Sequence, residues 1–203
     1  MPQRLKPEIR AGIVAAAAAV FAEKGYTGAR LSDIAAKADL STGNIYKYFG
    51  GKDDLFNDVV TPPTAARLLR LLRARVRELG TMEDWPAADA QGSRRADALL
   101  SFWIEQRLAV LILLDGSDGT RYEHVRVLIA REMERLAVAW LRERQGPESL
   151  TPEMVFVIRQ TFDHTVGMIA AILRHSGDAD SIRRAFGLFW RYQLAGLQAL
   201  FRS

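Results

Sequence analysis

Apolar residues recur every three to four positions along almost the whole of this 203-residue chain. That spacing places them on one face of an α-helix, whereas a half-buried strand alternates apolar and polar residues. The sequence shows no sustained alternation of that kind. The pattern therefore predicts an all-α protein, and a hydrophobic content of 49% is enough to give its helices a substantial core.

The N-terminal region predicts one helix of ordinary length followed by two short ones. Pro7 suits a first turn and Gly25 suits the position after a last turn, so the first helix is expected at 7–24. The two short helices are expected at 32–38 and 42–48, with Ser32 and Ser41 as their N-caps. Two short helices joined by a tight turn form a helix-turn-helix.

Longer helices are predicted for the remaining three quarters of the chain. Lys52 is expected to start a fourth helix, and the sequence Thr61-Pro62-Pro63 must kink or restart it, because proline lacks a backbone donor. The arginine-rich helix that follows is interpreted as a solvated linker helix, with a membrane-surface helix or a second DNA contact as alternatives. The helices are expected at 67–79, 94–114, 121–144, 152–174 and 181–201.

Several classes of site are absent from the sequence. There is no cysteine, which excludes disulfides, thiolate metal ligands and cysteine nucleophiles. The three histidines have no metal-ligand spacing, and no common catalytic motif is present. No apolar run reaches the ~18 residues that a membrane span needs. We therefore expect a soluble, cytoplasmic protein that is not an enzyme and has no cofactor, no metal and no membrane partner.

The segment 13–56, which includes STGNIYKYFGGK at 41–52, carries a set of residues at fixed spacing: Phe21, Gly25, Tyr26, Ile34, Ala35, Ala38, Ser41, Gly43, Ile45, Tyr46, Tyr48, Phe49, Lys52 and Leu55. In these positions it resembles the TetR family of bacterial transcriptional regulators. Arg30, Asp39 and Gly51 depart from the family pattern, where threonine, glycine and a serine or asparagine cap are usual.

The resemblance implies a helix-turn-helix DNA-binding domain at 1–60 and a helical-bundle domain at 61–203 that binds an effector and dimerises. It implies a homodimeric repressor that a small molecule releases from a palindromic operator on double-stranded DNA. The alternative is an effector-independent dimeric DNA-binding or architectural protein, in which the C-terminal bundle only dimerises.

The helix at 42–48 is the candidate DNA-reading element. Thr42 and Asn44 can hydrogen-bond base edges, Gly43 lets the backbone approach, and Lys47 can serve base or backbone. A solvated surface helix is the alternative. Tyr46, Tyr48 and Lys52 are phosphate contacts by resemblance. Thr27 either contacts a phosphate or shapes the turn, and Arg30 and Ser32 either reach the DNA or are solvated. The DNA-binding set is Thr27, Arg30, Ser32, Ser41, Thr42, Gly43, Asn44, Tyr46, Lys47, Tyr48 and Lys52.

The last two predicted helices are apolar on more than one face, whereas a surface helix buries a single stripe. By resemblance to the family, they are expected to pair with the same helices of a second chain. A fully buried intramolecular core is the alternative. The expected dimer-interface residues are Phe162, Val166, Ile169, Phe186, Phe189, Trp190, Leu197 and Phe201.

An effector site is sought among polar residues with apolar neighbours, because helical bundles hold ligands between their helices. For each of these residues, a position on the surface or in an interface is the alternative. The candidates are Phe102, Trp103, Gln106, Arg107, His124, Phe162, Asp163 and His164.

Overall fold

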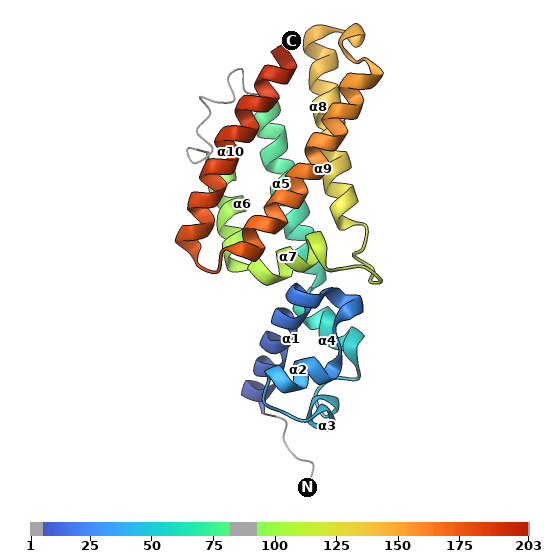
Figure 1. The fold of residues 1–203 in the computed structure, drawn as a ribbon, viewed down its shortest axis with the longest axis vertical. Helices are drawn as coiled ribbons and strands as arrows, with labels where there is room; N and C mark the ends of the chain where they lie inside the picture. The colour runs from blue at the N-terminus through green and yellow to red at the C-terminus, as the bar shows by residue number, and fades with distance from the viewer. Residues whose placement is uncertain (1–5, 82–92, 203) are drawn as a thin grey trace. The chain divides into compact units, whose positions relative to one another are not determined.

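The computed structural model describes residues 6–81 and 93–202 (Figure 1). Over these residues the chain forms α-helices, one short 3₁₀ helix and connecting turns, with no strand. The predicted all-α class is therefore confirmed. The chain divides into two compact units, one of Met1–Ala66 with Leu108–Glu123 and one of Arg67–Arg107 with His124–Ser203.

The first unit is built on four helices, α1 (Pro7–Gly28), α2 (Leu31–Lys37), α3 (Thr42–Tyr46) and α4 (Lys52–Val59). Helix α1 is interrupted at Gly25, whose φ of 68° and ψ of 169° are open only to glycine, so the predicted stop is confirmed. One large apolar residue from each helix is fully buried in the shared core. These residues are Phe21, Ile34, Ile45 and Leu55.

The turn between α2 and α3 takes the conformation that a glycine would favour. Asp39 has a φ of 55°, which aspartate tolerates better than most residues do. The backbone N–H of Leu40 donates to the carbonyl oxygen of Ala35 at 2.9 Å, which closes the end of α2. The replacement of the family's usual glycine by Asp39 therefore leaves the turn intact.

Helix α7 (Arg107–Asp115) lies far along the chain, yet most of it belongs to the first unit. Val110, Ile112 and Leu113 are fully buried. After α7, a Cβ placed on Gly116 would lie 3.2 Å from the carbonyl oxygen of Phe21, so the backbone of this turn packs directly on the last turns of α1.

The second unit consists of most of α5 (Pro62–Gly80), which enters it at Arg67, together with α6 (Arg94–Glu105), α8 (Val125–Gln145), α9 (Pro152–His175) and α10 (Ala179–Arg202), with a 3₁₀ helix at Pro147–Ser149. Helices α8 and α9 pack side by side, and α10 packs on α6 and α9 (Figure 1). Helix α5 begins at Pro62, so the proline pair restarts the chain as a helix, which is one of the two predicted outcomes.

Two local predictions are wrong. The expected helix 94–114 is broken at Gln106, where φ is −109° and ψ is 30°. Arg107 begins a new helix, and its Nη1 donates to the carbonyl oxygen of Leu173 at 2.7 Å, in the last turn of α9. Ser32 is not an N-cap, because α2 starts one residue earlier and Arg30 is the cap.

Candidate nucleic-acid interface and internal cavity

Helix α3 is only five residues long and depends on its neighbours for stability. Ser41 caps it as predicted, because its Oγ accepts a hydrogen bond from the backbone N–H of Asn44 at 3.2 Å. Ile45 and Phe49 are buried and hold the helix on the core. Thr42 and Gly43 are left exposed at the N-terminal end, where free backbone amides favour an anion.

Most of the predicted DNA-binding residues lie on the surface of the first unit. Tyr46 is 59% exposed, and exposed Lys47 donates to the side-chain oxygen of Asn44 at 3.0 Å. Tyr48 is half-buried, and its hydroxyl accepts from the backbone N–H of Lys6 at 3.3 Å. The exposed members of the set are Thr27, Arg30, Ser32, Ser41, Thr42, Gly43, Tyr46 and Lys47.

Lys52 has internal partners that the sequence did not indicate. Its Nζ donates to the carbonyl oxygens of Tyr26 and Ala29 at 2.9 and 3.1 Å, and it lies 4.3 Å from the centre of the Tyr26 ring. These contacts join the start of α4 to the end of α1. Any contact of Lys52 with a phosphate would therefore be made by a side chain that already stabilises the fold.

Tyr26 takes part in the same cluster. Its hydroxyl donates to Asp53, at the start of α4. Burial, the hydrogen bond to Asp53 and the negative charge of Asp53 together raise the pKa of Tyr26 to about 12. Tyr26 therefore stays neutral at physiological pH and acts as a donor that positions α4.

The start of α2 is held by charged groups. The backbone N–H of Arg30 donates to the Asp33 carboxylate at 3.3 Å, and Lys24 forms an ion pair with the same carboxylate at 3.0 Å. The hydrogen bond from Lys24 outweighs partial desolvation and holds the pKa of Asp33 below its usual value. The Arg30 guanidinium remains on the surface beside α2.

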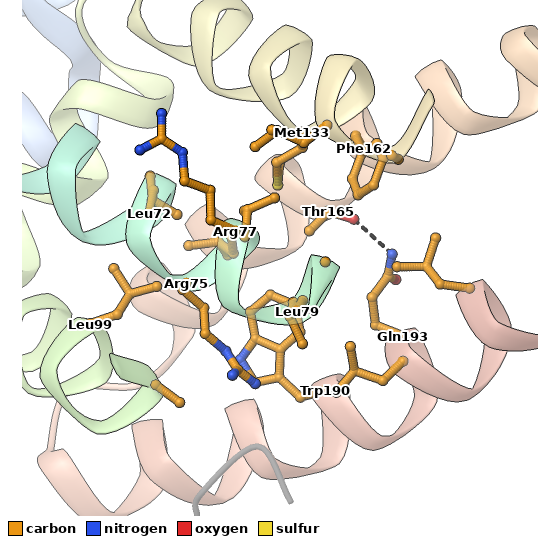
Figure 2. A pocket seen from close by; sticks show the side chains of 18 of the residues that line it. Leu72, Arg75, Arg77, Leu79, Leu99, Met133, Phe162, Thr165, Trp190 and Gln193 are labelled. Atoms are coloured by element: carbon orange, nitrogen blue, oxygen red, sulfur yellow. Dashed lines mark hydrogen bonds between the residues drawn. The ribbon is translucent and has the colours of Figure 1, made fainter. Parts of the chain in front are cut away.

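The second unit contains a partly open cavity of about 300 Å³ between α5, α6, α8, α9 and α10 (Figure 2). Most of its wall is apolar and aromatic, with Trp103, Phe162 and Trp190 among the residues that line it. The wall also contains three buried polar side chains, Arg75 and Gln193, each 8% exposed, and Thr165, 2% exposed. The volume and the lining are those of a site for a small, largely apolar molecule.

Two comparisons identify the family. The family described as "Bacterial regulatory proteins, tetR family" matches residues 13–59. An HTH-type transcriptional repressor of Mycobacterium tuberculosis is 30% identical over 158 residues, which cover 72% of this chain and 82% of that protein. The chain belongs to the TetR family. It is therefore a transcriptional regulator and not an enzyme.

Other proteins are similar to this TetR-family chain over different lengths. The HTH-type transcriptional regulator HbdR of an Aromatoleum species is 46% identical over 52 residues, which cover 26% of this chain and 23% of that protein. A crystal structure described as a TetR-family regulator from Mesorhizobium loti is 19% identical. The match covers 93% of this chain and 96% of that one, with a TM-score of 0.44.

In this TetR-family protein, two of the eight predicted ligand residues, Trp103 and Phe162, line the cavity. Phe102 is buried elsewhere, beneath the guanidinium of Arg67 at 5.0 Å. Arg107 bonds to α9, as described above, and Asp163 is half-buried outside the lining. Gln106, His124 and His164 are exposed.

Sequence reasoning missed the polar residues of the cavity, Arg75, Thr165 and Gln193. Arg75 was counted with the solvated arginines of α5. Its spacing from Leu68 and Leu72, however, continues the buried stripe of that helix at i, i+4 and i+7. Helical phase could therefore have distinguished it from the exposed arginines of α5. No comparable signal singles out Gln193.

The predicted dimer residues lie mostly inside this TetR-family chain. Phe162, Val166, Ile169, Phe186, Leu197 and Phe201 are buried in the second unit, and Phe189 and Trp190 are half-buried. The apolar residues left on the surface of α10 form another stripe. It comprises Leu188, Tyr192, Ala195, Gly196 and Ala199.

The described residues of this TetR-family protein include no helix that is both long and apolar enough to cross a bilayer. Within residues 6–81 and 93–202, His, Asp and Glu side chains form no cluster of three or more suited to a metal ion.

Proposed function

We propose that this regulator is a homodimeric repressor that leaves a palindromic operator when a small molecule enters the cavity of its second unit. The cavity is the observation that carries this proposal. A bundle that served only for dimerisation would have no need of a space of about 300 Å³ lined by aromatic side chains. The cavity thus favours an effector-dependent regulator over the effector-independent alternative.

The exposed end of α3 supports the DNA-binding step. Thr42 and Gly43 present a hydroxyl and open backbone, and Tyr46 and Lys47 extend outward beside them. In the proposed complex, α3 enters the major groove, and the lysine and tyrosine contact the flanking phosphates. Each cationic contact releases counterions, so affinity must fall with salt.

The surface of α10 supports the dimer. Leu188 is 62% exposed and Tyr192 is 77% exposed, and they lie four residues apart on one face. Ala195, Gly196 and Ala199 continue that face with small side chains that allow a second helix to approach closely. We place the dimer contact on this stripe, because the buried residues of α9 and α10 are already used within one chain.

The connection between α6 and α7 supports a route for release. Leu99 and Trp103 of α6 line the cavity, and α6 leads through the break at Gln106 into α7, most of which packs within the DNA-binding unit. A ligand that binds one arrangement of α6 more tightly shifts the population towards it. The spacing of the two α3 helices in the dimer then changes, and operator affinity falls.

The test begins by selecting operator sequences from random double-stranded DNA with the purified protein. We expect a palindrome, bound with an affinity that falls as salt rises. Lys47→Ala should weaken binding and lower the salt slope by about one, because one phosphate contact is lost. Arg94→Ala is the matched control, since Arg94 is exposed in the second unit and should leave the slope unchanged. Selection of no palindrome, or equal slopes for both variants, would refute the proposed DNA face.

A further inference from the structure

The charge of Arg75 determines what the cavity can hold. Arg75 lies on α5, is 8% exposed and lines the cavity (Figure 2). A buried cation is costly unless an anion matches it. Its Nη1 donates to the Glu78 carboxylate at 2.7 Å, one turn further along the same helix.

Glu78 is ionised and therefore supplies that match. Burial raises the pKa of its carboxyl, but hydrogen bonds from Ser93 and Arg75 and the charges of Arg75 and Arg95 more than offset burial. The pKa of Glu78 therefore lies below its usual value. The Ser93 hydroxyl donates to the same oxygen at 2.6 Å. Arg75 and Glu78 thus form a neutral pair, of which Arg75 lines the cavity.

The other charged residues of the lining face away or lie in solvent. Arg77 is exposed. The pKa of Glu132 on α8 is lowered mainly by the hydrogen bond from Arg135, and the positive charge of Arg77 adds to this effect. Figure 2 shows its guanidinium directed away from Arg75 and Trp190. Glu143 is exposed as well. Among the described lining residues, then, no buried charge is left unmatched.

Hydrogen-bonding capacity remains at several places in the wall. The indole N–H of Trp103 is buried and has no hydrogen-bond partner within the described residues. Arg75 has further N–H donors beyond the one bound to Glu78. On α10, the Gln193 amide nitrogen donates to the Thr165 hydroxyl at 2.9 Å, and Thr165 in turn donates to the carbonyl oxygen of Thr161 at 2.8 Å. Within the described residues the Gln193 carbonyl oxygen accepts no hydrogen bond.

We propose that the cavity selects an uncharged, largely apolar molecule that carries a hydrogen-bond acceptor for Arg75 and a donor for Gln193. The aromatic wall formed by residues such as Trp103 and Phe162 suits a flat ring system. A carboxylate would share one guanidinium with Glu78, and an ammonium ion would find no buried carboxylate that is free. This inference rests on the proposed function only in taking the bound molecule to be the effector.

The test uses three probes with one body and different charges: a naphthol carboxamide, the matching naphthol carboxylate and the matching aminomethyl naphthol. Binding to the full-length protein is measured by calorimetry at neutral pH. We expect the amide to bind at least tenfold more tightly than either ion. A carboxylate or an ammonium probe that binds as tightly as the amide, or an amide that does not bind, would overturn the proposal.

Glu78→Gln is the decisive variant, because it leaves Arg75 with an unmatched positive charge. The affinity of the carboxylate probe should then rise at least tenfold relative to that of the amide probe. The difference between the two affinities therefore becomes smaller or changes sign. Glu153→Gln is the matched control, since Glu153 is exposed on α9 and lies outside the cavity lining, and the order of the three affinities should stay as in the wild type. An unchanged preference in Glu78→Gln would show that the ion pair does not set selectivity.

Gln193→Leu provides a second variant that does not disturb the ion pair. It removes the free carbonyl oxygen but keeps a side chain of similar size, so the amide probe, whose naphthol hydroxyl would donate there, should bind about five- to tenfold more weakly. Equal affinity of the amide probe for this variant and for the wild type counts against the proposed contact.

The affinity of the protein for operator DNA, measured with each probe bound, then distinguishes the failure of one proposal from the failure of the other. A bound amide that leaves operator affinity unchanged refutes release, whereas lost charge selectivity refutes only the ligand class.

Discussion

The backbone N–H of Tyr26 donates to the carbonyl oxygen of Gly116 at 2.8 Å. Ninety residues of sequence separate these two atoms, and both belong to the DNA-binding unit. Gly25 and Gly116 permit the approach, because a Cβ on Gly116 would lie 3.5 Å from the Cα of Gly25. The end of α7 is thereby fixed to the end of α1 through main-chain atoms alone.

Gly116→Ala should destabilise the protein by about 1–3 kcal/mol, because its methyl group would press on the Phe21 carbonyl oxygen at 3.2 Å and on the Ile112 Cα at 3.4 Å. Backbone atoms cannot move aside as side-chain ends do. Gly12→Ala is the control, because Gly12 lies within α1 with open space around its Cβ position. This change should raise the free energy of unfolding by about 0.5–1 kcal/mol. Urea unfolding measures both. Equal stabilities for the two variants would contradict the close packing.

Stability should fall at alkaline pH as Tyr26 ionises. Its pKa is raised from 10.0 to about 12 by burial and by Asp53, so the folded state favours the neutral phenol. This contribution is complete below pH 10 and is lost as the pH rises towards about 12. Tyr26→Phe keeps the ring beneath Lys52 but should lose part of this alkaline decrease in stability. Tyr46→Phe, at a side chain that is 59% exposed, should show the same decrease as the wild type. Free energies of unfolding measured across this pH range test the difference.

Ser41→Ala should cost about 1 kcal/mol, because α3 loses the hydrogen bond that caps it. Ser32→Ala should change stability by less than about 0.5 kcal/mol, since Ser32 is exposed and caps nothing. Chemical unfolding of the two variants makes a direct comparison between serines at the starts of neighbouring helices. A larger loss for Ser32→Ala would reverse our assignment of the caps.

Leu188→Glu and Tyr192→Glu should convert the protein to a monomer, because each would place a charge in the proposed helix pair. Phe156→Glu changes a side chain on α9 that is also exposed, at 60%, and should leave the assembly as it is. Light scattering coupled to gel filtration gives the molar mass of each variant. A monomeric wild type would refute the proposed dimer. A Tyr192→Glu variant that remains dimeric would show that the dimer contact lies on another surface.

Local patterns were sufficient to predict much of the fold. The spacing of apolar residues predicts the helices. Gly25 indicates the interruption of α1, and Ser41 indicates the start of α3. These features depend on neighbours within a few positions, so a single sequence contains them. The position of α3 and its buried anchors Ile45 and Phe49 follow from the same information.

Features set by distant contacts could not be predicted in this way. No glycine or proline marks the break at Gln106, and the bond from Arg107 to the end of α9 forms only in the folded chain. The sequence pattern of an apolar helix face is also the same whether its own chain or a partner chain covers it. For this reason the sequence predicts Phe186 and Phe201 in a dimer interface, whereas the structure buries them within one chain. The internal use of Lys52 was hidden for the same reason.

The place of Leu108–Glu123 in the DNA-binding unit limits how this protein can be taken apart. A fragment cut near residue 60 would lose α7 and uncover the last turns of α1, on which Gly116 packs. Chimaeras that transplant the DNA-binding unit onto another second unit should therefore carry two pieces of chain, the N-terminal segment and the α7 segment. The DNA-binding unit is thus a discontinuous module made of two segments of chain.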